Sequence, residues 1–211
     1  KSLCYQLPAL SSAQGVTLVI SPLIALMKDQ IDSLPVGLRG RVTAINSSLD
    51  GDELRQRLGQ ISEGAYRLVY AAPERLRQPP FLHALRCAGV ERLVVDEAHC
   101  VSVWGHDFRP DYLAIGDARR QLGQPALLAV TATAPARVRQ DILRHLGAMR
   151  IIMADVVRPN LHLEVLEVGD NDAKLAHLMA IVGQDEAGSG IIYAGTRARC
   201  ESVAALLRSH G

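Results

Sequence analysis

The chain has 211 residues, of which 48% are hydrophobic, and a formal net charge of +1. This length and composition allow a globular protein with a substantial buried core and exclude a disordered tail. The apolar runs are far shorter than the roughly 20 residues that a membrane-spanning helix needs. A charge so close to zero gives no overall electrostatic signature of a nucleic-acid-binding protein. The four cysteines form no C-x-x-C pair, so they predict neither a zinc site nor a disulfide framework. The start of the chain shows no export signal, so we expect reduced thiols and no export.

Short runs rich in β-branched residues alternate with helical patterns along the chain. The predicted strands are residues 16–20, 41–45, 67–71, 92–96, 126–130, 161–168 and 190–194. Apolar residues recur at helical spacing between them, and the predicted helical faces are Leu23, Met27, Ile31 and Leu34, then Leu54, Leu58 and Ile61, then Val138, Ile142 and Leu146. This alternation predicts an α/β fold, with a parallel sheet flanked by helices.

The alternation is interrupted around residues 154–160, where Pro159 cannot continue a helix. We therefore predict two domains, over residues 1–157 and 158–211. The second contains two predicted strands and two helices, which are too few elements to close an independent sheet. The inward face predicted for its first helix is Leu175, Leu178, Met179 and Val182.

The chain begins with Lys1 and Ser2, the last two positions of the phosphate-binding pattern G-x-x-x-x-G-K-[ST]. In that pattern backbone amides surround the phosphates, the Lys neutralises phosphate charge and the Ser hydroxyl binds Mg²⁺. A lone Lys-Ser pair is common by chance. It becomes a candidate site only if other parts of the chain agree.

A predicted strand ends in two adjacent carboxylates, Asp96 and Glu97. Ligands meet an open α/β sheet at the carboxyl ends of its strands, where one carboxylate can hold Mg²⁺ while its neighbour orients an attacking water. We predict Asp96 on the metal side and Glu97 as the residue that activates water. The alternative is a solvated turn that caps the next helix, as in most isolated Asp-Glu pairs.

The segment that follows carries aromatic residues and Arg. It holds the only Trp of the chain, Trp104, and one of its two Phe, Phe108, beside Arg109. Aromatic faces interleaved with Arg grip single-stranded nucleic acid by base stacking and cation–π contacts. Packing in the core is the alternative, but the Gly, Pro and charged residues nearby predict a surface loop. His99 and His106 form no H-E-x-x-H pattern, which excludes a zinc protease of that type.

Together these motifs resemble the RecQ family of ATP-dependent DNA helicases, which are superfamily 2 motors of the DEAH-box type. Residues 96–112 are similar to the family's second motif joined to its aromatic-rich loop. Further similar blocks follow in order over nearly the whole chain, at residues 1–8, 21–30, 70–76, 130–134, 158–161 and 190–197. The resemblance implies a first RecA-like lobe and the beginning of a second, cut off at both ends.

The resemblance also implies a 3′-to-5′ motor that uses ATP and Mg²⁺ and acts on single-stranded and duplex DNA in repair and recombination. By this resemblance Lys1 and Ser2 hold phosphate and Mg²⁺, while Asp96 binds Mg²⁺ and Glu97 positions water. The residues assigned to DNA binding and coupling are His99, Trp104, His106, Phe108, Arg109, Thr131 and Thr133. The resemblance implies no membrane and names no protein partner. The motor would work on the bacterial nucleoid in the cytoplasm, or in the eukaryotic nucleus.

Val103 departs from the family, which usually has Gln at that place in the loop, and the change removes one polar contact. The glycines of the phosphate loop, an adenine-reading Gln and the later motifs with an interlobe Arg lie outside this sequence. We therefore expect the isolated chain to hydrolyse ATP feebly or not at all, and we expect no metal other than Mg²⁺. Two alternatives remain open: another superfamily 2 ATPase, such as an RNA helicase, and a catalytically inactive nucleic-acid-binding module.

Overall fold

The computed structural model describes residues 1–153, 159–183 and 188–209. The chain divides into two compact units, Lys1–Ile152 and Met153–Gly211, and each is described by itself. The predicted boundary between residues 157 and 158 lies outside the described residues. None of the helices in the described part is long and apolar enough to cross a membrane.

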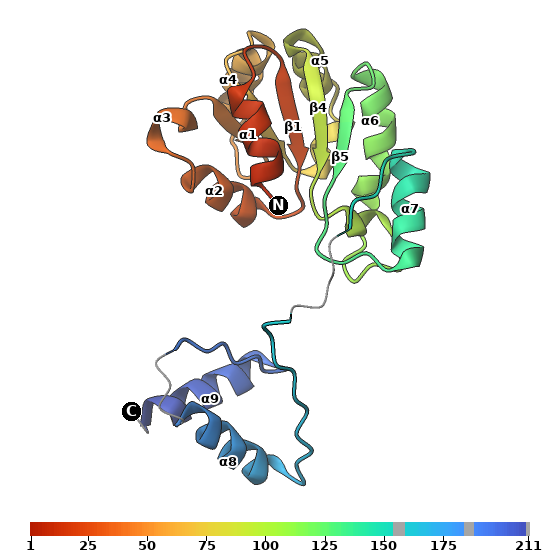
Figure 1. The fold of residues 1–211 in the computed structure, drawn as a ribbon. Helices are drawn as coiled ribbons and strands as arrows, with labels where there is room; N and C mark the ends of the chain where they lie inside the picture. Colours follow the sequence, from red (N-terminus) through yellow and green to blue (C-terminus); the bar gives the residue numbers. More distant parts are fainter. Residues whose placement is uncertain (154–158, 184–187, 210–211) are drawn as a thin grey trace. The chain divides into compact units, whose positions relative to one another are not determined.

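The first unit is built on a sheet of five parallel strands (Figure 1). Their order across the sheet is β2 (Val42–Ile45), β3 (Leu68–Ala71), β1 (Val16–Ile20), β4 (Val90–Val95) and β5 (Ala126–Ala129). The five strands predicted over this part of the chain are confirmed, each to within two residues at its ends. All five residues of β1 are buried, as expected for a central strand that is covered on both faces.

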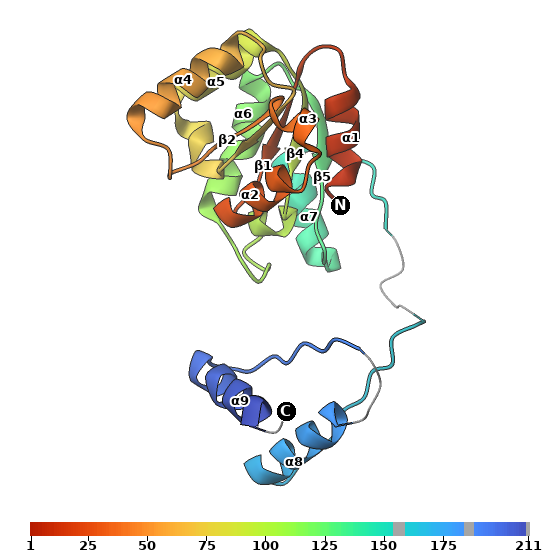
Figure 2. The same ribbon diagram turned by 90° about the vertical axis from the view of Figure 1, so that its left-hand side faces the viewer.

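Helices cover both faces of the sheet (Figure 2). They are α1 (Leu3–Ser11), α2 (Ile24–Asp32), α3 (Val36–Arg39), α4 (Gly51–Ser62), α5 (Pro79–Ala88), α6 (Ile115–Gln121) and α7 (Ala136–Leu146), with short 3₁₀ helices at Pro73–Arg77, Ala98–Val101 and Pro110–Ala114. Successive strand residues point to opposite faces, so Leu18 joins the core under α4 to α7 while Val19 joins the core under α1 and α2. The predicted α/β class, with a parallel sheet flanked by helices, is confirmed.

The second unit contains α8 (Asn171–Val182) and α9 (Arg197–Ser209) in its described residues. Helix α8 begins after Asp170, whose carboxylate accepts a hydrogen bond from the Ala173 amide at 2.8 Å. Val182 is 52% exposed, so its predicted inward position is wrong. It is the last residue of α8. The other three residues of the predicted face are half-buried, namely Leu175, Leu178 and Met179.

The two strands predicted in the second unit, at residues 161–168 and 190–194, are wrong. Neither segment is a strand in the structure. A strand is stabilised by hydrogen bonds to a neighbouring strand, and a pair of strands alone is marginal even when it forms. The described residues of this unit supply no paired strand for either segment.

The core of the first unit yields a prediction for Leu18, which lies in β1 and is 0% exposed. The substitution Leu18→Ala removes buried methyl groups and leaves a cavity, so we expect a loss of about 2–5 kcal/mol in the free energy of unfolding, measured with denaturant. Val36→Ala is the control, because Val36 is 78% exposed, and it should change that free energy by about 0.5 kcal/mol or less. Equal losses in the two variants would contradict the burial of Leu18.

Candidate active site

The predicted carboxylates lie where the parallel strands end. The backbone amide of Asp96 donates a hydrogen bond to the carbonyl of Ile20, at the end of β1, at 2.8 Å. The amide of Ala98 donates to the carbonyl of Val130, just after β5, at 3.0 Å. The short turn between these two amides is therefore held on both sides by the ends of the neighbouring strands.

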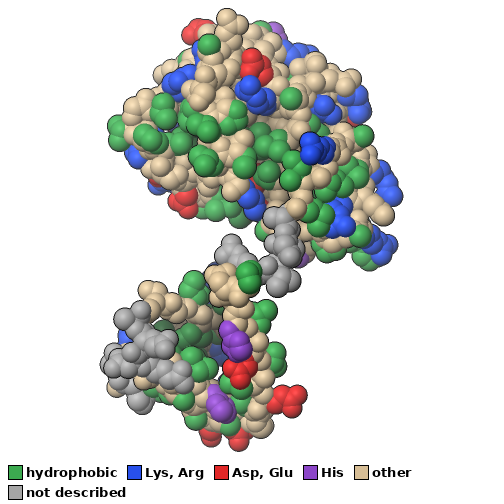
Figure 3. All heavy atoms as spheres, viewed as in Figure 1, with side chains coloured by type: hydrophobic (Ala, Val, Ile, Leu, Met, Phe, Trp, Pro, Cys, Tyr) green, Lys and Arg blue, Asp and Glu red, His purple; other side chains and the backbone are tan. Residues whose placement is uncertain are grey.

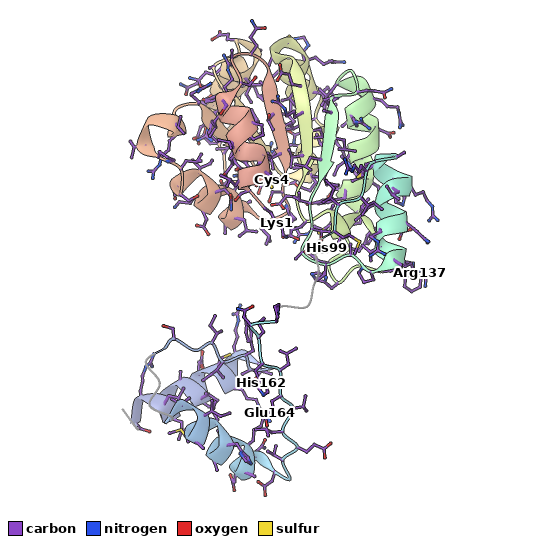
Figure 4. All side chains as sticks on the ribbon, viewed as in Figure 1. Lys1, Cys4, His99, Arg137, His162 and Glu164 are labelled. Atoms are coloured by element: carbon purple, nitrogen blue, oxygen red, sulfur yellow. The ribbon has the colours of Figure 1, made fainter. Side chains whose placement is uncertain are left out.

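Lys1 reaches the same edge of the sheet from the start of α1. Its Nζ donates to Oε1 of Glu97 at 3.2 Å, although the two residues are 96 positions apart. Ser2 caps the helix at its N-terminus, but its side chain makes no capping hydrogen bond. Figure 4 shows Lys1 and His99 at this same edge of the sheet. A helix N-terminus beside a Lys side chain favours an anion.

The chemistry of this set of donors fits a nucleotide with Mg²⁺. Ser2 and Asp96 carry the hard oxygen ligands that Mg²⁺ prefers, and Lys1 carries the charge that suits phosphate. Burial raises the pKa of the half-buried Asp96, and the Glu97 amide, which donates to Asp96 Oδ1 at 3.0 Å, lowers it in part. A nearby cation therefore favours the ionised form of this carboxylate.

Glu97 has an unusual backbone conformation, with φ 45° and ψ 49°, in the left-handed region. A side chain in this region costs roughly 1–2 kcal/mol, and such strain is often found at functional sites. The carbonyl of Glu97 accepts a hydrogen bond from the Cys100 amide at 2.9 Å, which helps to hold the turn. The turn brings the carboxylate to both Lys1 and His99.

His99 joins the carboxylate to two other predicted residues. Its Nδ1 lies 2.9 Å from Oγ1 of Thr131 and 3.3 Å from Oε2 of Glu97. Thr131 gives its single hydroxyl hydrogen to the carbonyl of Thr133 at 3.1 Å, so His99 Nδ1 is the donor in the contact with Thr131. The ring also stacks on His106, with centroids 4.2 Å apart. Burial, and then the neighbouring His106, lower the pKa of His99, which favours the neutral ring.

The aromatic loop begins directly after His99. Gly105 passes so close to the carbonyl of His99 that an added Cβ would lie 2.5 Å from that oxygen, so the position needs glycine. Trp104 is 58% exposed and Phe108 is half-buried. Both line a cavity of about 240 Å³ between the loop and α7. The predicted surface loop is thus present, with its Trp side chain accessible.

Arg109 ties the loop to the body of the unit. Its Nη1 donates to the carbonyl of Pro22 at 2.7 Å, while Nε and Nη2 donate to Oδ2 of Asp107 at 3.1 and 3.0 Å. Further along, the hydroxyl of Tyr112 donates to the carbonyl of Asp96 at 2.9 Å. In this arrangement Arg109 positions the loop, and its assignment to nucleic-acid binding stays a prediction.

Two contacts of the loop with α7 were not predicted from the sequence. The hydroxyl of Ser102 donates to Oδ2 of Asp141 at 2.7 Å. The guanidinium carbon of Arg137 lies 3.3 Å from the centroid of the Trp104 ring. No motif marks Asp141 or Arg137, and only the packing of α7 against the loop brings them there.

Comparison with family models matches residues 1–142 to the family described as DEAD/DEAH box helicase. The chain is 38% identical to the probable ATP-dependent DNA helicase RecS of Bacillus subtilis, in a match that covers 99% of the chain and 42% of RecS. It is 40% identical to the ATP-dependent DNA helicase RecQ of Pasteurella multocida, over 100% of the chain and 33% of that protein. The crystal structure of the DUF1998 helicase MrfA matches with a TM-score of 0.69 at 18% identity, over 99% of the chain and 34% of MrfA.

The resemblance to RecQ helicases that the motifs indicated is therefore confirmed, and the match to MrfA supports the fold alone. The chain spans less than half the length of either curated relative. The assignment of the second unit to a second RecA-like lobe stays a prediction.

The left-handed backbone of Glu97 yields a prediction that compares Glu97→Gly with Glu97→Ala. Both variants lose the carboxylate, but only Ala keeps a Cβ in the strained conformation. We expect the Gly variant to be more stable by about 0.5–1 kcal/mol in denaturant unfolding, after allowing for the greater freedom of Gly in the unfolded chain. The control pair is Gln56→Gly and Gln56→Ala, at a solvent-exposed position in the middle of α4. There the order should reverse, with the Ala variant more stable by about 1 kcal/mol. The same order at both sites would refute the strain.

The burial of His99 yields a prediction about pH. The unfolded chain takes up a proton at the ordinary pKa of 6.5, whereas the folded state resists it because the pKa of His99 is lowered. The neutral ring therefore contributes fully to stability above pH 6.5, the pKa of the unfolded state. This contribution is lost as the pH falls from 6.5 towards the lowered pKa of His99 in the folded state. When the pH is lowered from about 8 to about 5, the free energy of unfolding should fall less in His99→Gln than in the parent. His83→Gln, at an exposed site, should behave as the parent; identical losses in all three proteins would contradict the prediction.

Proposed function

Because the chain belongs to the DEAD/DEAH box helicase family, we propose that it forms part of a motor that couples ATP hydrolysis to movement along DNA. The observation that carries the proposal is the continuous set of contacts from Lys1 through Glu97 to His99, and from His99 to the loop of Trp104. This set joins a candidate phosphate site to a candidate single-strand site within one unit. The relatives named as ATP-dependent DNA helicases support DNA as the nucleic acid along which the motor moves.

The first group of residues acts on the nucleotide. Lys1 would exchange its contact with Glu97 for the more negative phosphates of ATP, and Ser2 and Asp96 would hold Mg²⁺. Bound Mg²⁺ supplies neutralisation of the phosphate charge. Once released from Lys1, the Glu97 carboxylate would accept a hydrogen bond from the attacking water and orient it.

The second group of residues reports the presence of DNA. A single strand stacks a base on Trp104, and the resulting shift of the loop reaches His99 through Gly105 and His106. Since His99 lies within 3.3 Å of Glu97, a movement of its ring alters the position of the carboxylate without a long relay. We propose that the motor moves 3′-to-5′ on single-stranded DNA, unwinds duplex DNA and serves repair or recombination.

The test uses a chimaera in which this chain replaces the matching segment of Pasteurella multocida RecQ. ATP hydrolysis is measured with and without single-stranded DNA for the parent, Glu97→Gln and Trp104→Ala. We expect DNA to stimulate the parent strongly. Glu97→Gln should lower kcat about a hundredfold or more, as for loss of a general base. Trp104→Ala should keep its DNA-free hydrolysis and lose the stimulation. Val36→Ala, at an exposed site in the first unit, is the control and should match the parent.

Three results would count against the proposal. Stimulation by RNA alone would indicate an RNA motor, and DNA binding that is indifferent to nucleotide would indicate an inactive binding module. Unwinding of a duplex with a 5′ single-stranded tail, but not of one with a 3′ tail, would exclude the 3′-to-5′ direction.

A further inference from the structure

Arg137 lies in the first turn of α7 and covers one face of the exposed Trp104 ring. Its guanidinium carbon is 3.3 Å from the ring centroid, a distance at which the guanidinium plane and the indole are in contact. Figure 4 shows Arg137 at the end of α7 that lies toward the same edge of the sheet as Lys1 and His99, the edge where the strands end. The side chain is itself exposed to solvent. The ring face beneath it is therefore closed to a base while this contact lasts.

The charge of Arg137 is not neutralised by a carboxylate in the described residues. Arg144, on the same helix, pairs with Asp141 at 3.0 Å, and Asp141 also accepts the hydroxyl hydrogen of Ser102. Arg139 donates to the carbonyl of Ala134 at 2.8 Å. Lys and Arg side chains gather on the side of the unit formed by α6 and α7 (Figure 3). Arg137 thus differs from Arg139 and Arg144, because within the described residues its guanidinium lies against an aromatic ring rather than a carboxylate or a carbonyl.

The Trp104 ring can be covered either by the Arg137 guanidinium or by a base, and the relative strengths of these two contacts favour the base. A solvent-exposed cation–π contact is weaker than the stacking of a base on an aromatic side chain. A base that stacks on this face can therefore displace the guanidinium from the ring. The displaced cation remains tethered to the first turn of α7, close to the nucleotide whose base took its place, and the charge available to it there is the phosphate.

We propose that Arg137 and Trp104 together form a nucleotide-binding element for single strands. At rest Arg137 occupies the indole face, and on binding it yields that face to a base and pairs with the backbone phosphate of the same strand. The proposal rests on the proposed function, since it takes a single-stranded nucleic acid as the ligand. It adds Arg137 as a binding residue that also sets how readily Trp104 becomes available.

The first experiment needs no DNA, because Trp104 is the only Trp of the chain and its fluorescence reports this site alone. Quenching by acrylamide is compared between the parent, Arg137→Gln and Arg139→Gln. Gln is well tolerated in an exposed helix and removes the charge without a cavity. We expect Arg137→Gln to uncover the ring and raise the quenching constant, while Arg139→Gln matches the parent. An unchanged constant in Arg137→Gln would overturn the resting contact.

The second experiment measures binding of a fluorescently labelled oligo-dT by anisotropy, over roughly 50 to 300 mM salt. Loss of one phosphate contact should make the plot of log affinity against log salt shallower by about 0.7 for a single strand. We expect this change in Arg137→Gln, a restored slope in Arg137→Lys, which keeps the charge, and the parent slope in Arg139→Gln.

The outcomes separate the two proposals. If the parent binds oligo-dT and the Arg137→Gln slope is unchanged, or if Arg139→Gln shows the same change, the role of Arg137 is refuted while the motor remains. If the parent chain binds no single strand at all, the binding element formed by Arg137 and Trp104 is refuted, while the motor is tested separately by the chimaera. In that case the quenching experiment still decides whether Arg137 covers Trp104.

Discussion

The parallel pairing of β4 between β1 and β5 determines the geometry of the candidate site. At the end of β4, Val95 is in register with Ile20 on one side and with Ala129 on the other. Beyond the last pair, the amide of Asp96 still donates to the carbonyl of Ile20, at the end of β1, and the amide of Ala98 to that of Val130, just after β5. The position of the turn that carries the carboxylates is therefore set by the sheet. The sheet is closely packed at this point, because all of β1 and the last three residues of β4 are buried.

Much of the fold could be predicted because a sheet buried on both faces leaves a simple pattern. Its strands are short continuous apolar runs between amphipathic helices, and residues 16–20 are an example. The segments 161–168 and 190–194 carry a similar local pattern but form no strands in the structure. Local pattern reports a preference for burial and extension, but the strand itself also requires a partner, and sequence spacing does not supply one.

The site was predictable to the extent that it depends on strand ends. Asp96 and Glu97 follow a predicted strand, and the carboxyl ends of parallel strands meet at one edge, which also brings Lys1 to Glu97. The left-handed backbone of Glu97 and the contact of Arg137 with Trp104 could not be predicted. The first is imposed by hydrogen bonds on either side of the turn, and the second depends on where α7 packs. Neither leaves a periodic or motif signal in the chain.

The aromatic loop is attached to the rest of the unit at both of its ends. At one end Gly105 lies against the carbonyl of His99, and at the other Tyr112 returns to the carbonyl of Asp96, one residue before Glu97. Both of these contacts lie close in the chain to Glu97, so the loop is fixed at both ends beside the same carboxylate. A segment pivoted at both ends cannot move away as a whole. Trp104 directly precedes Gly105 and so stands at one of the two fixed ends. We therefore expect a displacement of Trp104 to be passed to the peptide group of His99, two residues beyond Glu97, rather than to be taken up by movement of the whole loop.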